Sequence, residues 1–494
     1  MPETSARELI HEIGTAARRA SRITACASTE KKNAALERIA QALMTRRDVI
    51  QAANAVDLAN ARSEGLSAAF VDRLAVTDRV LDQMVTGVRQ IAELADPVGG
   101  IENLRPMPSG IRVGRMRVPL GVIAMIYESR PNVTIDAAAL AIKSGNAVIL
   151  RGGHEAIETN RALAAVVSEA LADAALPADA VQLIPTTDRA AVGELIRARD
   201  YVDVLIPRGG KGLIRSVVEN ATVPTIETGA GNCNAYVEKS ADFETALSII
   251  RNGKTSRPAV CNALEHVLVD REIAKAFLPL LKDALPGVKL KGDAEAAAIL
   301  GVEEVGDDEF FVEYDDLILS AKVVGGIEEA IAHINTHSTK HSDVILTTDL
   351  RKADAFTRAV DSAAVYVNAS TRFTDGGEFG FGAEIGISTQ KIHARGPFAA
   401  DALTTLIHEL LLPLVYCHIA LASAGAALPE SGLDKLADGL KKLISWLLCG
   451  AVTAFTLYLS VSGVLTGSAD RAAVKAAQTA VSGAVPVVGS ILAE

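Results

Sequence analysis

The 494-residue chain has five cysteines and 4% aromatic residues, and it contains no block of basic residues. Its formal net charge is −11. Nucleic acid is therefore not an expected partner, because phosphate backbones are bound by clustered Lys and Arg. The cysteines are scattered, and none forms a C-x-x-C pair. This pattern argues against a disulfide framework and against a zinc site, and it favours a reducing compartment.

Two further signals are missing. Residues 1–30 contain no uninterrupted apolar segment, which argues against a secretory signal and predicts a cytoplasmic location for the main part of the chain. The nine histidines form no H-x-x-H or H-E-x-x-H pattern. His337 and His341 are four residues apart, but no nearby set of carboxylates accompanies them. We therefore predict no metal site.

The composition changes near Thr405. Residues 410–428 and 443–469 contain no Asp, Glu, Lys or Arg, and each is long enough to cross a bilayer, which takes about 20 apolar residues. Residues 476–493 are also uncharged but contain Pro486 and many small residues. We predict an all-α transmembrane tail over 406–494, and a hydrophobic hairpin packed in an oligomer is the alternative.

Before this boundary, strand-like and helix-like segments alternate. The first hundred residues are Ala-rich with apolar residues three and four apart, which predicts helices. The segments "NAVILRGG", "AVQLIP" and "VDVLIPRGG" then each lead through a Gly or Pro turn into an amphipathic helix. This alternation predicts a mostly parallel sheet covered on both faces. Later strand-like runs, such as "HVLVD" and "SDVILTT", indicate a second α/β unit from about residue 262.

Three glycine-rich turns follow predicted strands: Gly152–Gly153, Gly209–Gly210 with Gly212, and Gly229 with Gly231. Glycine after a parallel strand lets backbone N–H groups approach a phosphate at a helix N-terminus. None of the turns has the pattern G-x-G-x-x-G, so simple tight turns remain the alternative to a nucleotide site.

Three other residues have two interpretations each. Cys261, in "SRPAVCNALEHVLV", is either a small buried hydrophobe or a nucleophile. Lys254 and Arg257 precede it within seven residues, and cations lower the pKa of a thiol. Asn132, in "YESRPNVTID", is either a helix cap or an amide donor for an oxyanion. Lys143, before a buried strand, is either a solvated loop residue or a ribose or 2′-phosphate contact at the carboxyl edge of the sheet.

Several long segments resemble the gamma-glutamyl phosphate reductases, also called glutamate-5-semialdehyde dehydrogenases, of the aldehyde dehydrogenase superfamily. They include "RVPLGVIAMIYESRPNVTIDAAALAIKSGNAVILRGG", "KTSRPAVCNALEHVLV" and "FGFGAEIGISTQKIHARGP", and the resemblance extends to about Thr405. It implies an α/β, aldehyde dehydrogenase-like fold with a Rossmann-type cofactor domain, an α/β catalytic domain and a small oligomerisation element. Residues 1–255 are expected to form an NADP-binding domain, with an oligomerisation hairpin near 111–128. Residues 256–368 are expected to form the catalytic domain, and residues 369–405 a return segment that contributes to oligomerisation.

The resemblance also implies a role for individual residues. Cys261 falls on the catalytic nucleophile and Asn132 on the oxyanion donor. Contacts to the cofactor, NADPH, fall on Lys143, Gly209, Gly210, Gly212, Glu227 and Gly229. The implied reaction reduces L-glutamyl 5-phosphate to L-glutamate 5-semialdehyde through a Cys261 thioester and releases phosphate, a step of proline biosynthesis. Glutamate 5-kinase and further copies of the chain are the implied protein partners.

The tail resembles the membrane region of stage III sporulation protein AE, through "KLADGLKKLISWLLCGAVTAFTLYLSVSGVLTGSADRAAVKAAQTAVSGAVPVVGS". A natural fusion, an engineered chimera and a misjoined reading frame all fit this junction. Two functions follow: an NADPH-dependent reductase attached to a membrane, or a sporulation-type membrane-assembly protein with an inactive reductase-like scaffold. Cys261, Asn132 and the glycine turns favour the enzyme, because a scaffold does not need them.

Overall fold

The computed structural model describes residues 5–409, except 109–110, 129, 382 and 392–393. The chain divides into two units, one made of residues 1–99 and 117–405 and the other of residues 100–116 and 406–494. The predicted transmembrane spans lie outside the described residues. Within the described part of the chain, none of the helices combines the length and the apolar character that a bilayer crossing requires.

Five helices precede the first sheet: α1 (Ala6–Thr24), α2 (Thr29–Thr45), α3 (Arg47–Ser63), α4 (Ala68–Leu74) and α5 (Asp78–Glu93). Four of them begin after a Ser or Thr whose side chain accepts a hydrogen bond from the backbone of the first turn, namely Ser5, Ser28, Ser67 and Thr77. Such side chains satisfy N–H groups that have no partner within the helix. The helical prediction for this region is therefore matched by local capping chemistry.

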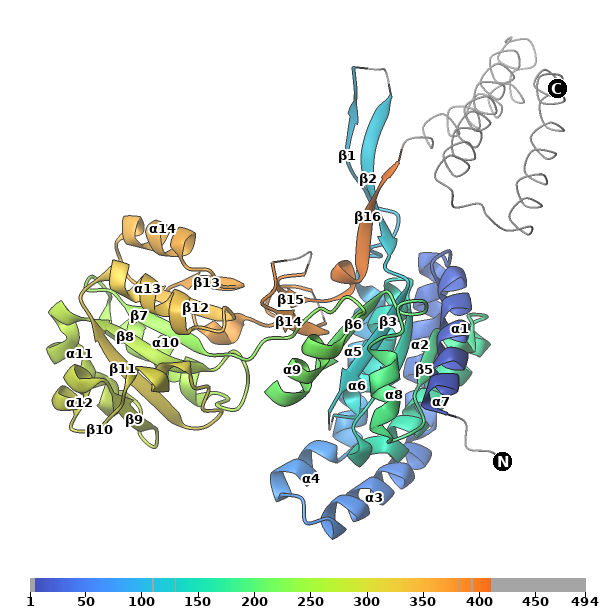
Figure 1. Cartoon of the computed structure of the whole chain (residues 1–494), viewed down its shortest axis with the longest axis horizontal. Helices are drawn as coiled ribbons and strands as arrows, with labels where there is room; N and C mark the ends of the chain where they lie inside the picture. Colours follow the sequence, from blue (N-terminus) through green and yellow to red (C-terminus); the bar gives the residue numbers. More distant parts are fainter. Residues whose placement is uncertain (1–4, 109–110, 129, 382, 392–393, 410–494) are drawn as a thin grey trace. The chain divides into compact units, whose positions relative to one another are not determined.

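The first sheet has four parallel strands in the order β5-β4-β3-β6 (Figure 1). Successive residues of the central strand β3 point into two different cores, so that Ile123 and Met125 face α2, α5, α6 and α7 while Val122 and Ala124 face α1 and α8. This alternation is the period of two expected of a strand buried on both faces. The strands are β3 (Val122–Tyr127), β4 (Ala147–Arg151), β5 (Val181–Leu183) and β6 (Val204–Arg208), and the helices between and after them are α6 (Asn132–Lys143), η1 (His154–Ala156), α7 (Ile157–Asp173), η2 (Ala178–Ala180), α8 (Arg189–Leu195) and α9 (Lys211–Asn220).

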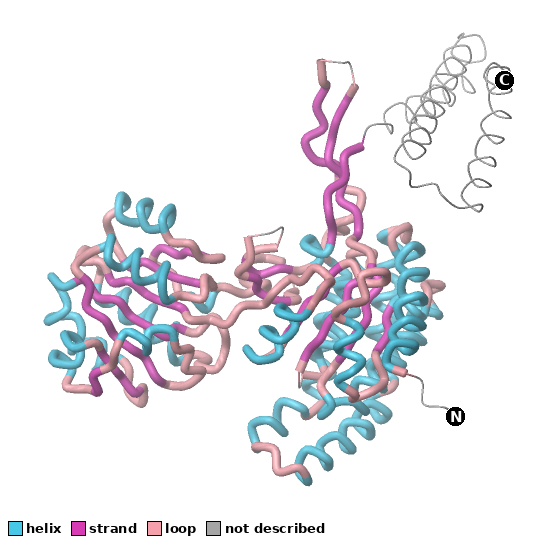
Figure 2. Tube along the Cα trace, in the orientation of Figure 1, coloured by secondary structure: helices cyan, strands magenta, loops and turns pink. Residues whose placement is uncertain are grey.

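The second sheet has seven parallel strands in the order β10-β9-β11-β8-β7-β12-β13. Helices α10, α11 and α12 pack on one face, and α13 and α14 pack on the other (Figure 2). Its elements are β7 (Cys233–Val237), α10 (Phe243–Thr255), β8 (Leu264–Asp270), α11 (Arg271–Ala284), β9 (Lys289–Gly292), α12 (Ala294–Leu300), β10 (Glu303–Glu304), η3 (Asp307–Phe311), β11 (Ile318–Val324), α13 (Ile327–His337), β12 (Ser342–Leu346), α14 (Leu350–Ala359) and β13 (Ala364–Val367).

The structure corrects two expected boundaries. Strand β7 lies between β8 and β12, so the second α/β unit begins near residue 233 rather than at 256 or 262. The hairpin is formed by β1 (Ile101–Pro106) and β2 (Arg112–Pro119) rather than by residues 111–128, because the following run, "VIAMIY", is apolar on both faces and forms the centre of the first sheet.

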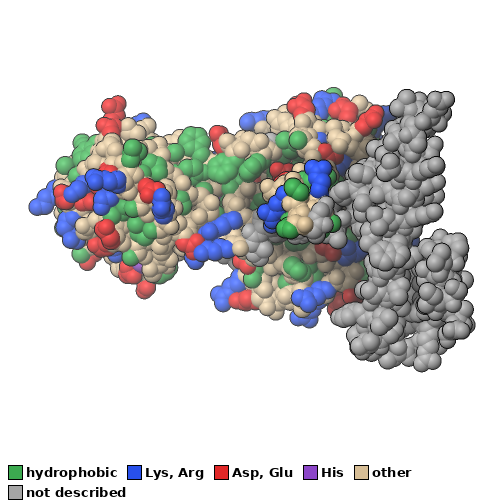
Figure 3. Space-filling view, turned by 90° about the horizontal axis from the view of Figure 1, so that it is seen from above, with side chains coloured by type: hydrophobic (Ala, Val, Ile, Leu, Met, Phe, Trp, Pro, Cys, Tyr) green, Lys and Arg blue, Asp and Glu red, His purple; other side chains and the backbone are tan. Residues whose placement is uncertain are grey.

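Smaller elements complete the described chain. Strands β14 (Gly386–Ser388) and β15 (Gly396–Phe398) form an antiparallel pair after η4 (Thr371–Phe373), and η5 (Ala400–Leu403) precedes β16 (Thr404–Glu409). Strand β16 joins the hairpin in a sheet of order β1-β2-β16. On the face shown in Figure 3, Lys and Arg side chains lie among Asp and Glu side chains rather than in one block.

Candidate active site

A cavity of about 610 Å³ brings Cys261 together with residues that follow the strands of the first sheet. Tyr127 ends β3 and Glu128 follows it, and Arg208 ends β6 and Gly209 follows it. Because the carboxyl ends of parallel strands meet at one edge of a sheet, these residues converge although they are about 80 positions apart in the chain. The sequence-predicted nucleophile therefore lies on the wall of a cavity.

The backbone at Cys261 is packed closely against the loop before β7. A Cβ atom added to Gly231 would lie 1.3 Å from the Cys261 carbonyl oxygen, so only glycine fits there. The thiol of Cys233 donates a hydrogen bond of 3.4 Å to the same oxygen. The segment that contains Gly231 and Cys233 thus fixes the position of the half-buried Cys261.

The charges around Cys261 differ from those expected. Burial, followed by the carboxylates of Glu384 and Glu313, raises the pKa of the Cys261 thiol to about 12, against the opposing effect of Arg208. Lys254, expected to lower the pKa, is fully buried and donates to Glu265 over 2.8 Å instead. Arg257 is exposed. The sequence neighbours Lys254 and Arg257 are therefore not the groups that act on the thiol, which corrects the expectation that they lower its pKa.

Arginine side chains line the same cavity, although sequence reasoning assigned none of them. Arg73, Arg130 and Arg208 are among the lining residues. Burial lowers the pKa of Arg130, and the charges of Arg208 and Arg73 lower it further. Arg208 donates to the carbonyl oxygen of Ile385 over 2.7 Å. Mutually repelling guanidinium groups beside a cavity are suited to an anionic ligand that would offset their repulsion.

The glycine turn after β6 contacts a carboxylate in this structure. The backbone N–H of Gly210 donates to Glu128 Oε2 over 2.8 Å, and a Cβ on Gly209 would lie 2.6 Å from the Glu128 carboxyl carbon. Gly209, Gly210 and Gly229 line the 610 Å³ cavity. Glu227 lies outside this lining, and its carboxylate accepts a 2.9 Å hydrogen bond from Gln390.

A second cleft, of about 930 Å³, adjoins the first, since Tyr127 and Glu128 line both. Gly212, which was predicted from the sequence, lies here, together with Arg151 and Gly153. Arg151 donates to the carbonyl oxygens of Gly152 and Thr187, but its buried Nε has no hydrogen-bond partner. A cleft with guanidinium donors and glycine turns at a helix N-terminus fits the size and charge of a dinucleotide.

Two predicted site residues lie elsewhere. Asn132 is the first residue of α6, and its amide nitrogen donates to Asp136 over 3.1 Å. Lys143, at the other end of α6, is fully buried and donates to Asn33 and to the Ala92 carbonyl, each over 2.8 Å. The placement of Lys143 at the carboxyl edge was wrong, because a residue that immediately precedes a strand lies at the amino edge. Arg151, the last residue of the strand that Lys143 precedes, lies at the carboxyl edge instead.

Comparisons with known proteins agree with this geometry. The aldehyde dehydrogenase family model matches residues 2–302, and the chain belongs to this family. The expected α/β, aldehyde dehydrogenase-like fold is therefore confirmed, and this fold implies a nicotinamide cofactor.

More particularly, the chain belongs to the gamma-glutamyl phosphate reductases. It is 54% identical over 395 residues to the reductase of Moorella thermoacetica, covering 79% of this chain and 94% of the relative. The reductase of Halothermothrix orenii is 51% identical over 392 residues, with the same shares covered. The crystal structure of the Thermotoga maritima reductase matches with a TM-score of 0.81 and 46% identity, over 81% of this chain and 98% of that chain. The family predicted from the sequence is confirmed.

The C-terminal region matches a different family. The model of stage III sporulation protein AE covers residues 394–494, in agreement with the second resemblance. Most of this match lies outside the described residues.

Proposed function

We propose that the chain catalyses the reduction of L-glutamyl 5-phosphate to L-glutamate 5-semialdehyde, with release of phosphate, as a step of proline biosynthesis. The observation that carries the proposal is a single cavity lined by both Cys261 and arginines, which adjoins a cleft of a size that fits a dinucleotide. The names of the relatives, gamma-glutamyl phosphate reductases, agree with this substrate.

In this proposal Cys261 is the nucleophile. Its sulfur bonds to the glutamyl 5-carbon, the carbon–oxygen bond to phosphate breaks, and the thiol proton leaves with the displaced phosphate. Arg130 and Arg208 hold the phosphate beside the sulfur, since guanidinium groups pair with phosphate oxygens. Phosphate is a good leaving group, so this step needs little acid catalysis.

Two amides are assigned to the oxyanion that forms at the carbonyl. They are the backbone N–H of Cys261 and the side chain of Asn132, whose neighbours Arg130 and Val133 line the cavity. Asn132 must leave Asp136 to take this role. Donors of this kind stabilise charge that develops in the transition state, and each typically contributes about a hundred- to a thousandfold in rate.

NADPH is the proposed cofactor, and it supplies a hydride to the acyl carbon when bound. Arg151 and Arg189 line the cleft and suit a dinucleotide with an additional 2′-phosphate. We propose that Gly209, Gly210 and Gly229 let the backbone approach the cofactor, that Gly212 does so at the start of α9, and that the Glu227–Gln390 pair positions the loop beside the nicotinamide.

The test is Cys261→Ala, with Cys26→Ala as the matched control because Cys26 is an exposed cysteine outside the cavity. We expect Cys261→Ala to abolish phosphate-dependent NADP reduction by glutamate 5-semialdehyde and Cys26→Ala to retain it. Near-normal turnover in Cys261→Ala would exclude the proposed chemistry.

Oligomerisation is assigned to the β1–β2 hairpin. Ile101, Leu104 and Ile111 are 40–47% exposed on it, and exposed apolar side chains that lie close together mark contact surfaces. Replacing Leu104 with Asp should lower the molar mass measured by light scattering after size-exclusion chromatography. An unchanged mass would count against the hairpin as the contact.

The tail is proposed to attach the enzyme to a membrane, on the basis of its uncharged segments and its family match. The alternative of an inactive scaffold is not favoured, because the enzyme part keeps Cys261 on its cavity. Assays of NADP reduction in soluble and membrane fractions distinguish the two: activity in the membrane fraction supports attachment, and inactive protein there supports the scaffold.

A further inference from the structure

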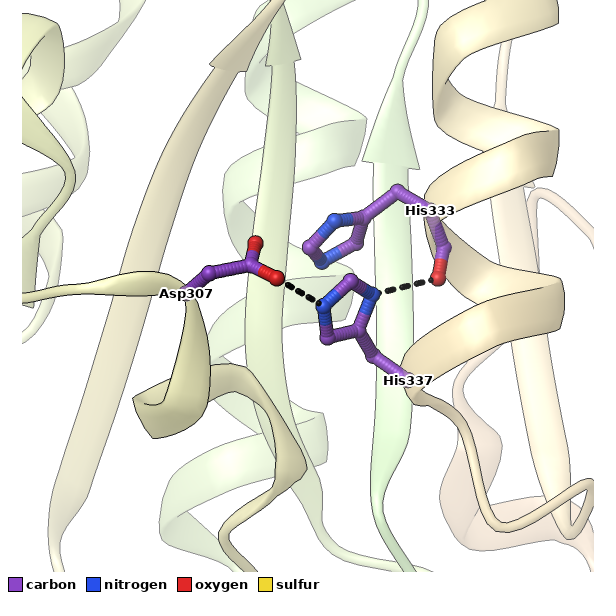
Figure 4. Close-up of side chains that lie close together, drawn as sticks. All are labelled: Asp307, His333 and His337. Atoms are coloured by element: carbon purple, nitrogen blue, oxygen red, sulfur yellow. Dashed lines mark hydrogen bonds and ion pairs between the residues drawn. The ribbon is translucent and has the colours of Figure 1, made fainter.

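A separate cluster of potential ligands lies between η3 and α13, and none of its members lines the Cys261 cavity. Asp307 begins η3, and His333 and His337 lie on α13 (Figure 4). Their potential ligand atoms all lie within 4.8 Å of one another. Residues four apart on a helix share a face, so the sequence spacing of the two histidines is that of a pair able to bind one ion.

Both ring nitrogens of His337 face oxygen atoms. Its Nδ1 lies 2.9 Å from the carbonyl oxygen of His333, and its Nε2 lies 2.9 Å from Oδ2 of Asp307. Both oxygens are acceptors, and a neutral imidazole has a single N–H, so it can donate to only one of them. If Nδ1 donates to the His333 carbonyl, the Nε2 lone pair faces the Asp307 carboxylate, as it would beside a shared cation. A ligating histidine commonly donates its other N–H to a backbone carbonyl, as Nδ1 of His337 does here.

His333 contributes a buried nitrogen without a partner. Its side chain is nearly buried, with the residue 6% exposed, and no hydrogen-bond partner contacts its Nε2. The ring stacks on His337 with centroids 4.0 Å apart and Phe310 packs against its edge. A buried polar atom without a hydrogen bond costs about 1–3 kcal/mol. A bound cation would satisfy this nitrogen, whereas no other feature of the described residues does.

We propose that Asp307, His333 and His337 bind a divalent transition-metal ion, with Zn²⁺ as the preferred ion. Two imidazoles and a carboxylate are ligands that Zn²⁺ accepts at about 2.0–2.2 Å, and water would complete the tetrahedron because Asp307 is open to solvent. Ligands of such an ion are about 3.3 Å apart, so small side-chain rotations close the site.

Lys322 is the neighbouring cation that opposes binding. Its Nζ lies 3.4 Å from Oδ1 of Asp307 and over the ring of Phe310. It contacts the carboxylate oxygen that does not face His337, so Oδ2 stays available to the ion. Because the positive charge of Lys322 repels a cation at Asp307, we expect a Lys322→Met variant to bind Zn²⁺ more tightly.

The ion would join two segments that are already linked beside the active site. Asn232 Nδ2 donates to the carbonyl oxygens of Phe310 and His337, over 2.7 and 2.8 Å. The chain after η3 leads to Glu313, which lines the Cys261 cavity and accepts a 2.7 Å hydrogen bond from the Gly231 N–H. The site is thus placed to stabilise the segment that carries Glu313, as a structural ion rather than a participant in the reaction.

The test uses the full-length chain treated with chelator and then titrated with Zn²⁺ by calorimetry. His333→Gln and Asp307→Ala should each weaken the tightest site by at least about tenfold, since even outer-shell partners of metal ligands contribute 10–100-fold. His11→Gln, at an exposed histidine on α1, is the matched control and should leave the affinity unchanged.

Co²⁺ spectra separate this site from a cysteine site. Visible d–d bands without a near-ultraviolet thiolate band support the histidine and carboxylate ligands, and a thiolate band would overturn them. The melting temperature of each variant without metal verifies that the variant folds. Zn²⁺ affinity unchanged in both Asp307→Ala and His333→Gln would also overturn the proposal.

Discussion

The two edges of the four-stranded sheet use similar cationic side chains in different ways. At the amino edge, Lys143 is buried and donates to Asn33 and the Ala92 carbonyl. At the carboxyl edge, Arg151 and Arg208 line clefts, and Arg151 retains a donor with no partner. A cation whose donors are satisfied by the protein stabilises the fold, whereas one with remaining donors beside a cleft is available to a ligand. The direction of the chain at each strand decides between these two roles.

The largest effect that tests this comparison is expected from Arg208→Ala. Loss of its charge removes a proposed phosphate partner and a cation that opposes the high pKa of Cys261. We expect kcat/KM for glutamyl phosphate to fall about 100- to 1,000-fold, the range seen when one charge-stabilising donor is removed. Steady-state kinetics measures the effect.

Arg208→Lys serves as the control, because it keeps the charge but loses the forked donor geometry, and it should recover part of the loss. A kcat/KM of Arg208→Ala within a few-fold of the parent enzyme, with an unchanged melting temperature, would contradict an anion-binding role for this edge.

Substitutions of Arg151 and Lys143 compare the roles of the two edges directly, with a smaller expected effect. Arg151→Ala should raise the KM for the proposed cofactor NADPH about tenfold, since a proposed ion pair with phosphate is lost. It should lower stability less than Lys143→Met does, because Arg151 is only half-buried and one of its two acceptors, on Thr187, is exposed. Lys143→Met should leave the KM for the cofactor unchanged. It removes the donor to Asn33 Oδ1 and to the Ala92 carbonyl oxygen and should lower the free energy of unfolding by about 1–3 kcal/mol. Cofactor titration and urea unfolding measure the two quantities. A raised KM in Lys143→Met alone would reverse the assignment.

The sequence was informative where function depends on local pattern. The predicted parallel sheet is covered on both faces, since successive residues of "VIAMIY" point into two cores, although this run was expected in the hairpin near 111–128. The Cys261 and glycine-turn motifs lie at the cavity or the adjoining cleft. Prediction from the sequence failed for contacts between residues that are far apart in the chain. Glu384 is 123 positions after Cys261 in the chain, yet its carboxylate is the strongest charge acting on the thiol. Lys254 is seven positions before Cys261 and pairs with Glu265 instead. Nearness in sequence could not predict the electrostatics of the sulfur.

The smallest expected effect comes from Glu384→Gln, which removes one of these distant charges. In Glu384→Gln the side chain keeps its shape but loses a negative charge that opposes thiolate formation, so the pKa of Cys261 should fall below its value of about 12 in the parent. Below that pKa, the thiolate fraction of the parent rises about tenfold per pH unit. The variant should therefore react several-fold faster with iodoacetamide at pH 8, in the absence of substrate, with the Cys261 peptide followed by mass spectrometry.

Glu227→Gln is the matched control, because this carboxylate is bonded to Gln390 and does not line the cavity. Its alkylation rate should equal that of the parent. Equal rates in Glu384→Gln and the parent across pH 7–10 would mean that burial alone sets the pKa of the thiol. In that case the carboxylates at the cavity would act on the substrate rather than on the sulfur.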